Sequence, residues 1–130
     1  MNKIYSKFIS FSIVFCLAFP PQTGFALPQG QSVVYGDAVF NTSGNTLQIQ
    51  QNTDRMIANY NSFSIANGET VRFIQPSSSS MALNRVVGVS PSEIFGTLTA
   101  NGQIFLVNPN GVVFGRTAQV DVGGLMASTL

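Results

Sequence analysis

Apolar and polar residues alternate through several short stretches of the chain after residue 26. Leu47 and Ile49 alternate with glutamines, and Val71 and Phe73 flank Arg72 in the same way. A period of two places alternate side chains on opposite faces of an extended strand, and no stretch after residue 26 sustains the period of a helix. The pattern therefore predicts an all-β domain built from half-buried strands.

Turn-forming residues separate these strands at short intervals, which leaves a sandwich, a barrel and a β-solenoid open. Two observations favour the solenoid. The runs Ile104-Phe105-Leu106-Val107 and Val112-Val113-Phe114 are apolar on both faces and need cover on both sides. Asn is also abundant at the expected corners, where its amide can stack between successive coils. The corner sequences are Ser43-Gly44-Asn45, Ala66-Asn67-Gly68, Pro76 through Ser80, Ser90-Pro91-Ser92, Asn101-Gly102 and Asn108-Pro109-Asn110-Gly111.

The strand pattern predicts that ten apolar side chains point into one core. With roughly 100 residues after residue 26, the chain is long enough for one domain with such a core. The ten residues are Leu47, Ile49, Phe63, Ile65, Val71, Phe73, Ile104, Leu106, Val120 and Val122.

Residues 1–26 have the three parts of a secretory signal peptide. Lys3 and Lys7 make the start positive, residues 8–19 form an almost wholly apolar run, and Gly24-Phe25-Ala26 fits the small-x-small cleavage pattern. The alternative is a transmembrane helix, which needs roughly 20 apolar residues, and this run is shorter. Cleavage after Ala26 would also remove Cys16, the only cysteine, so the exported chain would contain no disulfide.

The composition argues against most enzyme and metal sites. The sequence has no His, which removes Ser-His and Cys-His pairs and most transition-metal sites. The five acidic residues are scattered singly, so neither a catalytic carboxylate pair nor a calcium loop is expected. After residue 26, four arginines face five acids, which leaves no basic footprint for a nucleic acid. We therefore expect no catalysis, no metal and no cofactor.

The tetrapeptide Asn108-Pro109-Asn110-Gly111 has the composition of a type I turn. Asn can bond its own backbone at the first position, Pro presets the second, and Gly suits the fourth. Turn chemistry alone allows an ordinary tight corner between two buried strands as readily as a functional element.

A long block around this turn resembles a known family. The block runs from residue 82 to residue 115 and contains Asn84-Arg85, Asn101-Gly102 and the Asn108 to Gly111 turn. It resembles the filamentous-haemagglutinin-type secretion domain of two-partner secretion exoproteins, and stretches at 62–76 and 122–130 extend the resemblance to nearly the whole chain after residue 26. One difference is that Ser90-Pro91-Ser92-Glu93 stands where many members carry an upstream Asn-Pro-Asn-Leu motif. The chain therefore resembles the large haemagglutinins and contact-toxin proteins that lack this motif.

The resemblance implies a right-handed parallel β-helix with capping or extra-helical β-strands. It also implies a secretion signal that the general secretion machinery delivers to the periplasm of a Gram-negative bacterium. There, the POTRA domains of a cognate outer-membrane β-barrel transporter would recognise the domain, which would nucleate β-helix folding outside the cell. The sites implied are Asn108, Pro109, Asn110 and Gly111 for transporter recognition or a structural turn, and Asn84, Arg85, Asn101 and Gly102 in the family block.

Two other functions remain open at this point. An adhesin module could bind a host glycan or receptor directly, and a β-helix enzyme could act on polysaccharide. Adhesion, with a role in virulence, is the more credible because exoproteins of the resembled family often are adhesins, although their binding surface usually lies downstream. Residues 123–130 run apolar to the last position, so we expect residues 27–130 to be the N-terminal part of a longer secretion domain.

Overall fold

The computed structural model describes residues 26–130, so the predicted signal peptide lies outside the described residues except for Ala26. Every regular element in the described part is a β-strand, as the alternating pattern predicts. No helix there is long and apolar enough to cross a membrane.

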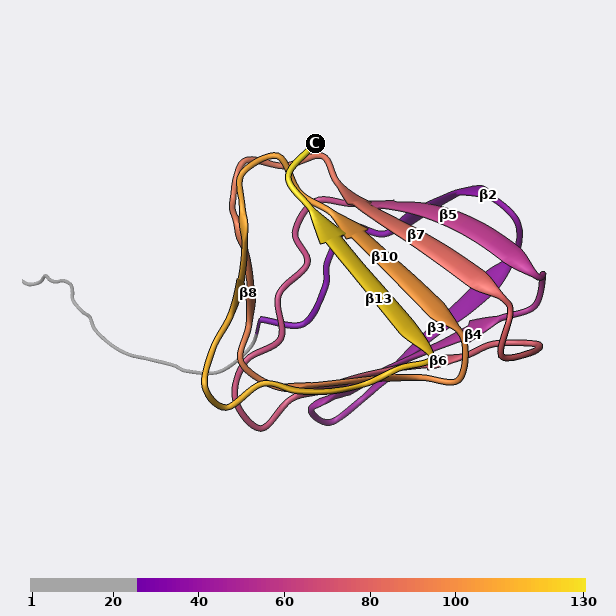
Figure 1. The fold of residues 1–130 in the computed structure, drawn as a ribbon, viewed down its shortest axis with the longest axis horizontal. Helices are drawn as coiled ribbons and strands as arrows, with labels where there is room; N and C mark the ends of the chain where they lie inside the picture. Colours follow the sequence, from indigo (N-terminus) through magenta and orange to yellow (C-terminus); the bar gives the residue numbers. More distant parts are fainter. Residues whose placement is uncertain (1–25) are drawn as a thin grey trace, which may run out of the picture.

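Parallel strands form the three sides of a solenoid of about four turns, which Figure 1 shows in a roughly triangular cross-section. The first side, the β4 sheet, contains β4 (Thr46–Gln51), β6 (Thr70–Ile74), β9 (Thr97–Ala100) and β12 (Gln119–Asp121). The second side, the β5 sheet, contains β5 (Arg55–Tyr60), β7 (Met81–Val86), β10 (Gln103–Val107) and β13 (Gly124–Ser128). The third side contains β8 (Ser92–Ile94) and β11 (Val112–Phe114). The predicted parallel β-helix is thus confirmed.

The strand register places similar side chains of successive coils directly above one another. Leu47 of β4 pairs in parallel with Val71 of β6, which pairs with Leu98 of β9. All three side chains are buried, because successive residues of a strand alternate between the two faces of a sheet. Each inward column therefore continues the core from coil to coil.

Two additional strands cover the first coil. β2 (Ser32–Tyr35) pairs antiparallel with β5, and β3 (Ala38–Ser43) pairs antiparallel with β4. Gly36 joins the two strands with φ of 85°, and a Cβ atom there would lie 2.4 Å from the carbonyl oxygen of Arg55, so only glycine fits. β2 and β3 are the capping strands that the family resemblance implies.

The core lies inside the solenoid and is the one the alternation predicts for eight of the ten residues. Leu47, Ile49, Phe63, Ile65, Val71, Phe73, Ile104 and Leu106 are all buried. Val122 is only partly buried against this core. Val120 was expected inside but is 39% exposed, because it lies on β12, the last strand of the β4 sheet, with no further described coil beyond it.

The expectation that both doubly apolar runs are covered on both sides is wrong for the described chain. Val113 and Phe114 of β11 are 50% and 41% exposed. β11 pairs with β8 alone, so the described residues provide no strand on its other edge. On β10, Ile104 and Leu106 face the core, whereas Phe105 and Val107 point outward and are half-buried.

Candidate functional site

The segment from Asn108 to Gly111 closes as a tight turn between β10 and β11. The backbone N–H of Gly111 donates to the Asn108 carbonyl oxygen at 3.0 Å, and the N–H of Asn110 donates to the Asn108 side-chain oxygen at 2.9 Å. Gly111 has φ of 115°, a left-handed conformation that glycine adopts without a steric cost. The turn predicted from this tetrapeptide is confirmed, although β11 beyond it is largely exposed instead of buried.

Asn108 is buried and ties three coils together. Its side-chain Nδ2 donates to the Ser90 carbonyl oxygen and to Ser92 Oγ, both at 3.0 Å, in the preceding coil. Its backbone N–H donates to the Ser128 carbonyl oxygen at 2.9 Å in the following coil. The position therefore demands a side chain with both an amide donor and an acceptor, which explains the Asn in structural terms.

Pro109 and Asn110 are the exposed members of the turn. The Asn110 side chain donates to the carbonyl oxygen of Gly88 at 2.9 Å and to the Asn108 side-chain oxygen at 3.1 Å. The carbonyl of Gly111 accepts a bond from the Ser92 N–H at 2.9 Å, so the turn stacks on residues 88–92. The surface that this corner offers a partner is Pro109 and Asn110.

Asn84 lies inside the solenoid and cannot be touched by a partner of the folded domain. It is buried, accepts a hydrogen bond from the Tyr60 hydroxyl at 2.9 Å and donates to the Phe105 carbonyl oxygen at 3.2 Å. Burial raises the pKa of the Tyr60 phenol, since the charged form would be desolvated there. The neighbouring Arg85 is exposed and donates from Nε to the Asn59 side-chain oxygen at 3.0 Å.

Asn101 and Gly102 occupy the corner before β10. The side-chain oxygen of Asn101 accepts from the N–H of Gln75, and its amide donates to the Gln75 carbonyl oxygen, both at 2.8 Å. The N–H of Gly102 donates to Gln75 Oε1, also at 2.8 Å. This corner and the Asn108 turn lie at opposite ends of a five-residue strand, roughly 17 Å apart along an extended chain. The predicted site residues therefore do not converge on one site.

Sequence reasoning missed the amide ladder at this corner. The buried Gln75 donates from Nε2 to Oε1 of the buried Gln51 at 3.2 Å, and Gln51 in turn donates to the carbonyl oxygens of Thr53, Asp54 and Met81. The expectation that asparagine amides link successive coils is borne out by Asn101 at this corner, and the two glutamines add a second, unpredicted set of links. The signal available was that a glutamine ends each of two successive strand stretches, Leu47 to Gln51 and Val71 to Gln75.

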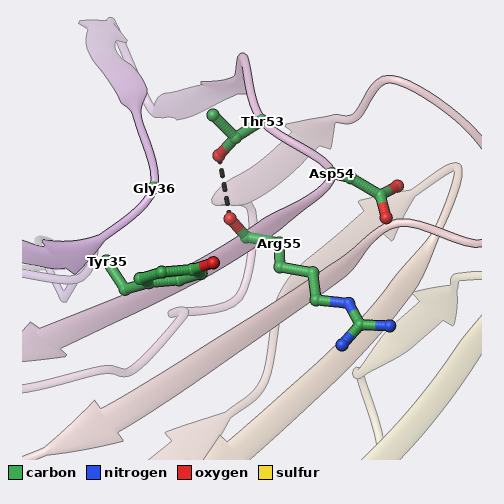
Figure 2. A pocket seen from close by; sticks show the side chains of 5 residues that line it. All are labelled: Tyr35, Gly36, Thr53, Asp54 and Arg55. Atoms are coloured by element: carbon green, nitrogen blue, oxygen red, sulfur yellow. Dashed lines mark hydrogen bonds between the residues drawn. The ribbon is translucent and has the colours of Figure 1, made fainter.

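A pocket of about 570 Å³ lies between the β2–β3 connection and the start of β5, and Figure 2 shows the side chains that line it. Its lining contains one acid, Asp54, and one base, Arg55, beside the exposed ring of Tyr35. The hydroxyl of Thr53 donates to the Arg55 carbonyl oxygen at 2.8 Å and accepts from the Asp37 N–H at 3.0 Å. One carboxylate cannot act as an acid and base pair, and residues 26–130 contain no group of three His, Cys, Asp or Glu side chains placed to hold a metal ion.

The geometry is thus a stacked scaffold with a solvent-facing turn. Comparison with known proteins identifies the family and the fold. A family model of the TPS secretion domain matches residues 25–130. The heme/hemopexin-binding protein of Haemophilus influenzae strain Rd is 47% identical over 103 residues, and a second Haemophilus influenzae protein of that name is 39% identical. The match covers 79% and 78% of this chain but only 11% of either relative.

A solved structure shares the fold. The crystal structure of the HMW1 secretion domain from Haemophilus influenzae superposes with a TM-score of 0.76 and is 40% identical in sequence. The likeness covers 79% of this chain and 27% of that structure. The chain is therefore a good deal shorter than the domain it matches.

Proposed function

Because the chain belongs to the family of TPS secretion domains, the export domains of two-partner secreted exoproteins, we propose that a cognate outer-membrane transporter recognises it in the periplasm through POTRA domains. We further propose that it nucleates β-helix folding once outside the cell. The observation that supports the proposal most is that the family match extends over residues 25–130, which is the whole described solenoid.

The physical character of the chain fits passage in an unfolded state. Only 8% of its residues are charged, and residues 27–130 contain no cysteine, so no disulfide can lock the chain before export. A strand-rich segment of this kind can add to an exposed sheet edge through backbone hydrogen bonds, while side-chain pockets provide selectivity. These properties support POTRA recognition of an extended chain.

The stacked coils support the nucleation role. β12 and β13 each pair on one side only, with β9 and β10, so each leaves one edge of N–H and C=O groups without a described strand. In a solenoid, each coil is stabilised mainly by its neighbours, so a formed coil lowers the cost of the next. The domain can therefore template coils that follow it in a longer exoprotein.

The name of the relatives suggests heme or hemopexin binding, but we propose this activity for a different part of such a protein. The chain contains no His, the commonest protein ligand of haem iron, and the described residues have no candidate metal cluster. The shared segment is 11% of the relatives, and secretion is what the family match describes.

Export and binding can be measured together to test the proposal. The chain, produced with its leader beside the cognate transporter, should reach the medium, and the purified exported chain, kept unfolded in mild denaturant, should bind the isolated POTRA domains. Direct binding of the folded chain to host cells, without POTRA binding or transporter-dependent export, would instead support the adhesin alternative. Export that is independent of the transporter would refute the proposed role.

A further inference from the structure

Glu69 is a buried carboxylate at the N-terminal end of the solenoid. Its side chain is 2% exposed and lies just before β6. Within the described residues, its hydrogen-bond donors are two backbone N–H groups. Ala66 donates to Oε1 at 2.9 Å, and Ala26 donates to both Oε1 and Oε2 at 3.2 Å. A carboxylate withdrawn from water is costly unless a positive charge or several donors compensate for the lost solvent.

One of these donors belongs to Ala26, the residue just before the bond where the leader is expected to be cut. Cleavage after Ala26 removes the Ala26 N–H together with the leader, and it converts the backbone nitrogen of Leu27 into an α-ammonium group. Leu27 lies in the same place as Glu69: both line a cavity of about 220 Å³ together with Pro28 and Thr42. The new positive charge is therefore created one residue from an atom that already contacts both carboxylate oxygens.

We propose that the Glu69 carboxylate is the binding site for the α-ammonium group of Leu27 that leader cleavage produces. The three N–H donors of the ammonium group replace the single N–H donor lost with Ala26. The partner of the Glu69 carboxylate thereby becomes a charged group instead of a neutral amide. Charge-assisted hydrogen bonds are about twice as strong as neutral ones, and the low dielectric of a buried site strengthens them further. Leader removal thus gives the buried Glu69 carboxylate a charged partner.

The Leu27 position is fixed by the structure that follows it. Its side chain packs against the core, Pro28 is buried, and the N–H of Gln29 donates to the Ser62 carbonyl oxygen at 3.0 Å. These contacts hold residues 27–29 against the first coil whether or not the leader is present. Adjacent Cα atoms are 3.8 Å apart, so the ammonium group would have to move by less than about 4 Å to take the place of the Ala26 N–H.

The α-amine of the exported chain can be modified selectively. Both lysines, Lys3 and Lys7, precede Ala26, so an exported chain that begins at Leu27 has its α-amine as the sole primary amine. Acetylation with an N-hydroxysuccinimide ester removes that charge without a mutation. We expect acetylation to lower the melting temperature of the parent and of Glu93→Gln, which replaces the other, exposed glutamate. We expect it to leave the melting temperature of Glu69→Gln unchanged.

Equal losses in Glu69→Gln and in the parent, or no loss in the parent, would overturn the proposal. If Glu69→Gln does not fold, the acetylation rate of the parent decides. Its α-amine should react about tenfold more slowly in the folded protein than in urea, because the ion pair with Glu69 must first open. Equal rates would refute this ion pair. Intact mass after export defines the N-terminus. A product that begins elsewhere also refutes the proposal but leaves transporter-dependent export, and so the proposed function, untouched.

Discussion

The side-chain amide of Asn108 donates a hydrogen bond of 3.0 Å to Ser92 Oγ, and both residues are fully buried although 16 positions separate them in the chain. Substitution of Asn108 therefore leaves buried polar groups without partners and destabilises the fold. A loss of export by an Asn108 variant could not be told from a loss of folding. The exposed Asn110 is the position that can separate recognition from stability.

We predict that Asn110→Ala reduces transporter-dependent export while it lowers stability by only about 1 kcal/mol, because the two hydrogen bonds of this exposed side chain each have a small net value. Asn45→Ala is the matched control. Asn45 is also exposed and also links two coils, from Nδ2 to the Gly68 carbonyl oxygen at 2.7 Å, but at another corner. Export, POTRA affinity and melting temperature are measured for both variants. Equal export by the two variants would reduce the Asn108 to Gly111 turn to a structural corner.

Phe73→Ala should destabilise the domain by about 3–5 kcal/mol, because a side chain only 1% exposed leaves a cavity in the core. A loss of this size can abolish folding in a domain of about 100 residues. Phe114→Ala removes the same side chain from a position that is 41% exposed and should cost much less. Urea denaturation followed by circular dichroism compares the two, and similar midpoints would contradict the strand register described above.

The buried Tyr60 hydroxyl should make the stability of the fold depend on pH in the alkaline range. Its raised pKa means that the folded state holds the phenol proton at a pH where the unfolded chain releases it. The stability that depends on this proton is fully present below the unfolded pKa, about 10, and falls as the pH rises above that value.

Tyr60→Phe should lower stability near neutral pH by about 1–3 kcal/mol, since the Asn84 side-chain oxygen loses its donor. The variant should also lose less stability than the parent between neutral pH and alkaline pH. Tyr35→Phe is the control, because the Tyr35 side chain is 60% exposed. An identical alkaline dependence in Tyr60→Phe and the parent would show that another group controls it.

The Gln51 and Gln75 pair predicts non-additive substitutions. Gln75→Leu leaves Gln51 Oε1 and the N–H of Gly102 without their partner at a buried corner, and each unpaired group costs about 1–3 kcal/mol. The double variant Gln51→Leu with Gln75→Leu should cost less than the sum of the two single variants. The exposed Gln50→Leu serves as the control for a change of composition alone. Strict additivity in chemical denaturation would argue against the ladder.

The alternating residues predicted much of the fold because they report local geometry. Leu47 and Ile49 must share a face of any strand, and that face had to be buried whichever β architecture formed. The stacking of Leu47 on Val71 and Leu98 could not be read from the same pattern. Period-two alternation defines faces within a strand, but it does not say which strands become neighbours. The choice of a solenoid rested on the doubly apolar runs, the Asn-rich corners and the family resemblance.

The candidate site was less predictable because its residues act over long distances in the sequence. Turn chemistry gave the conformation of Asn108 to Gly111, but the bonds from Asn108 to Ser90 and Ser92 depend on the coil length. Glu69 follows Asn67-Gly68 and has the local sequence of an exposed turn acid, yet the capping segment at residues 26–29 buries it. Val120 alternates like a core residue and is exposed because of its place in the stack. In all three cases, segments distant in the sequence decide the environment of the residue, and no local pattern contains them.

The antiparallel direction of β2 and β3 gives the solenoid a polarity. These strands occupy the N-terminal edges of the β5 and β4 sheets, where a parallel coil would otherwise be able to add. If the domain nucleates β-helix folding as proposed, further parallel coils would add at the β12 and β13 edges, in the order of the sequence. A chain delivered gradually from its N-terminal end would then wind in a single direction.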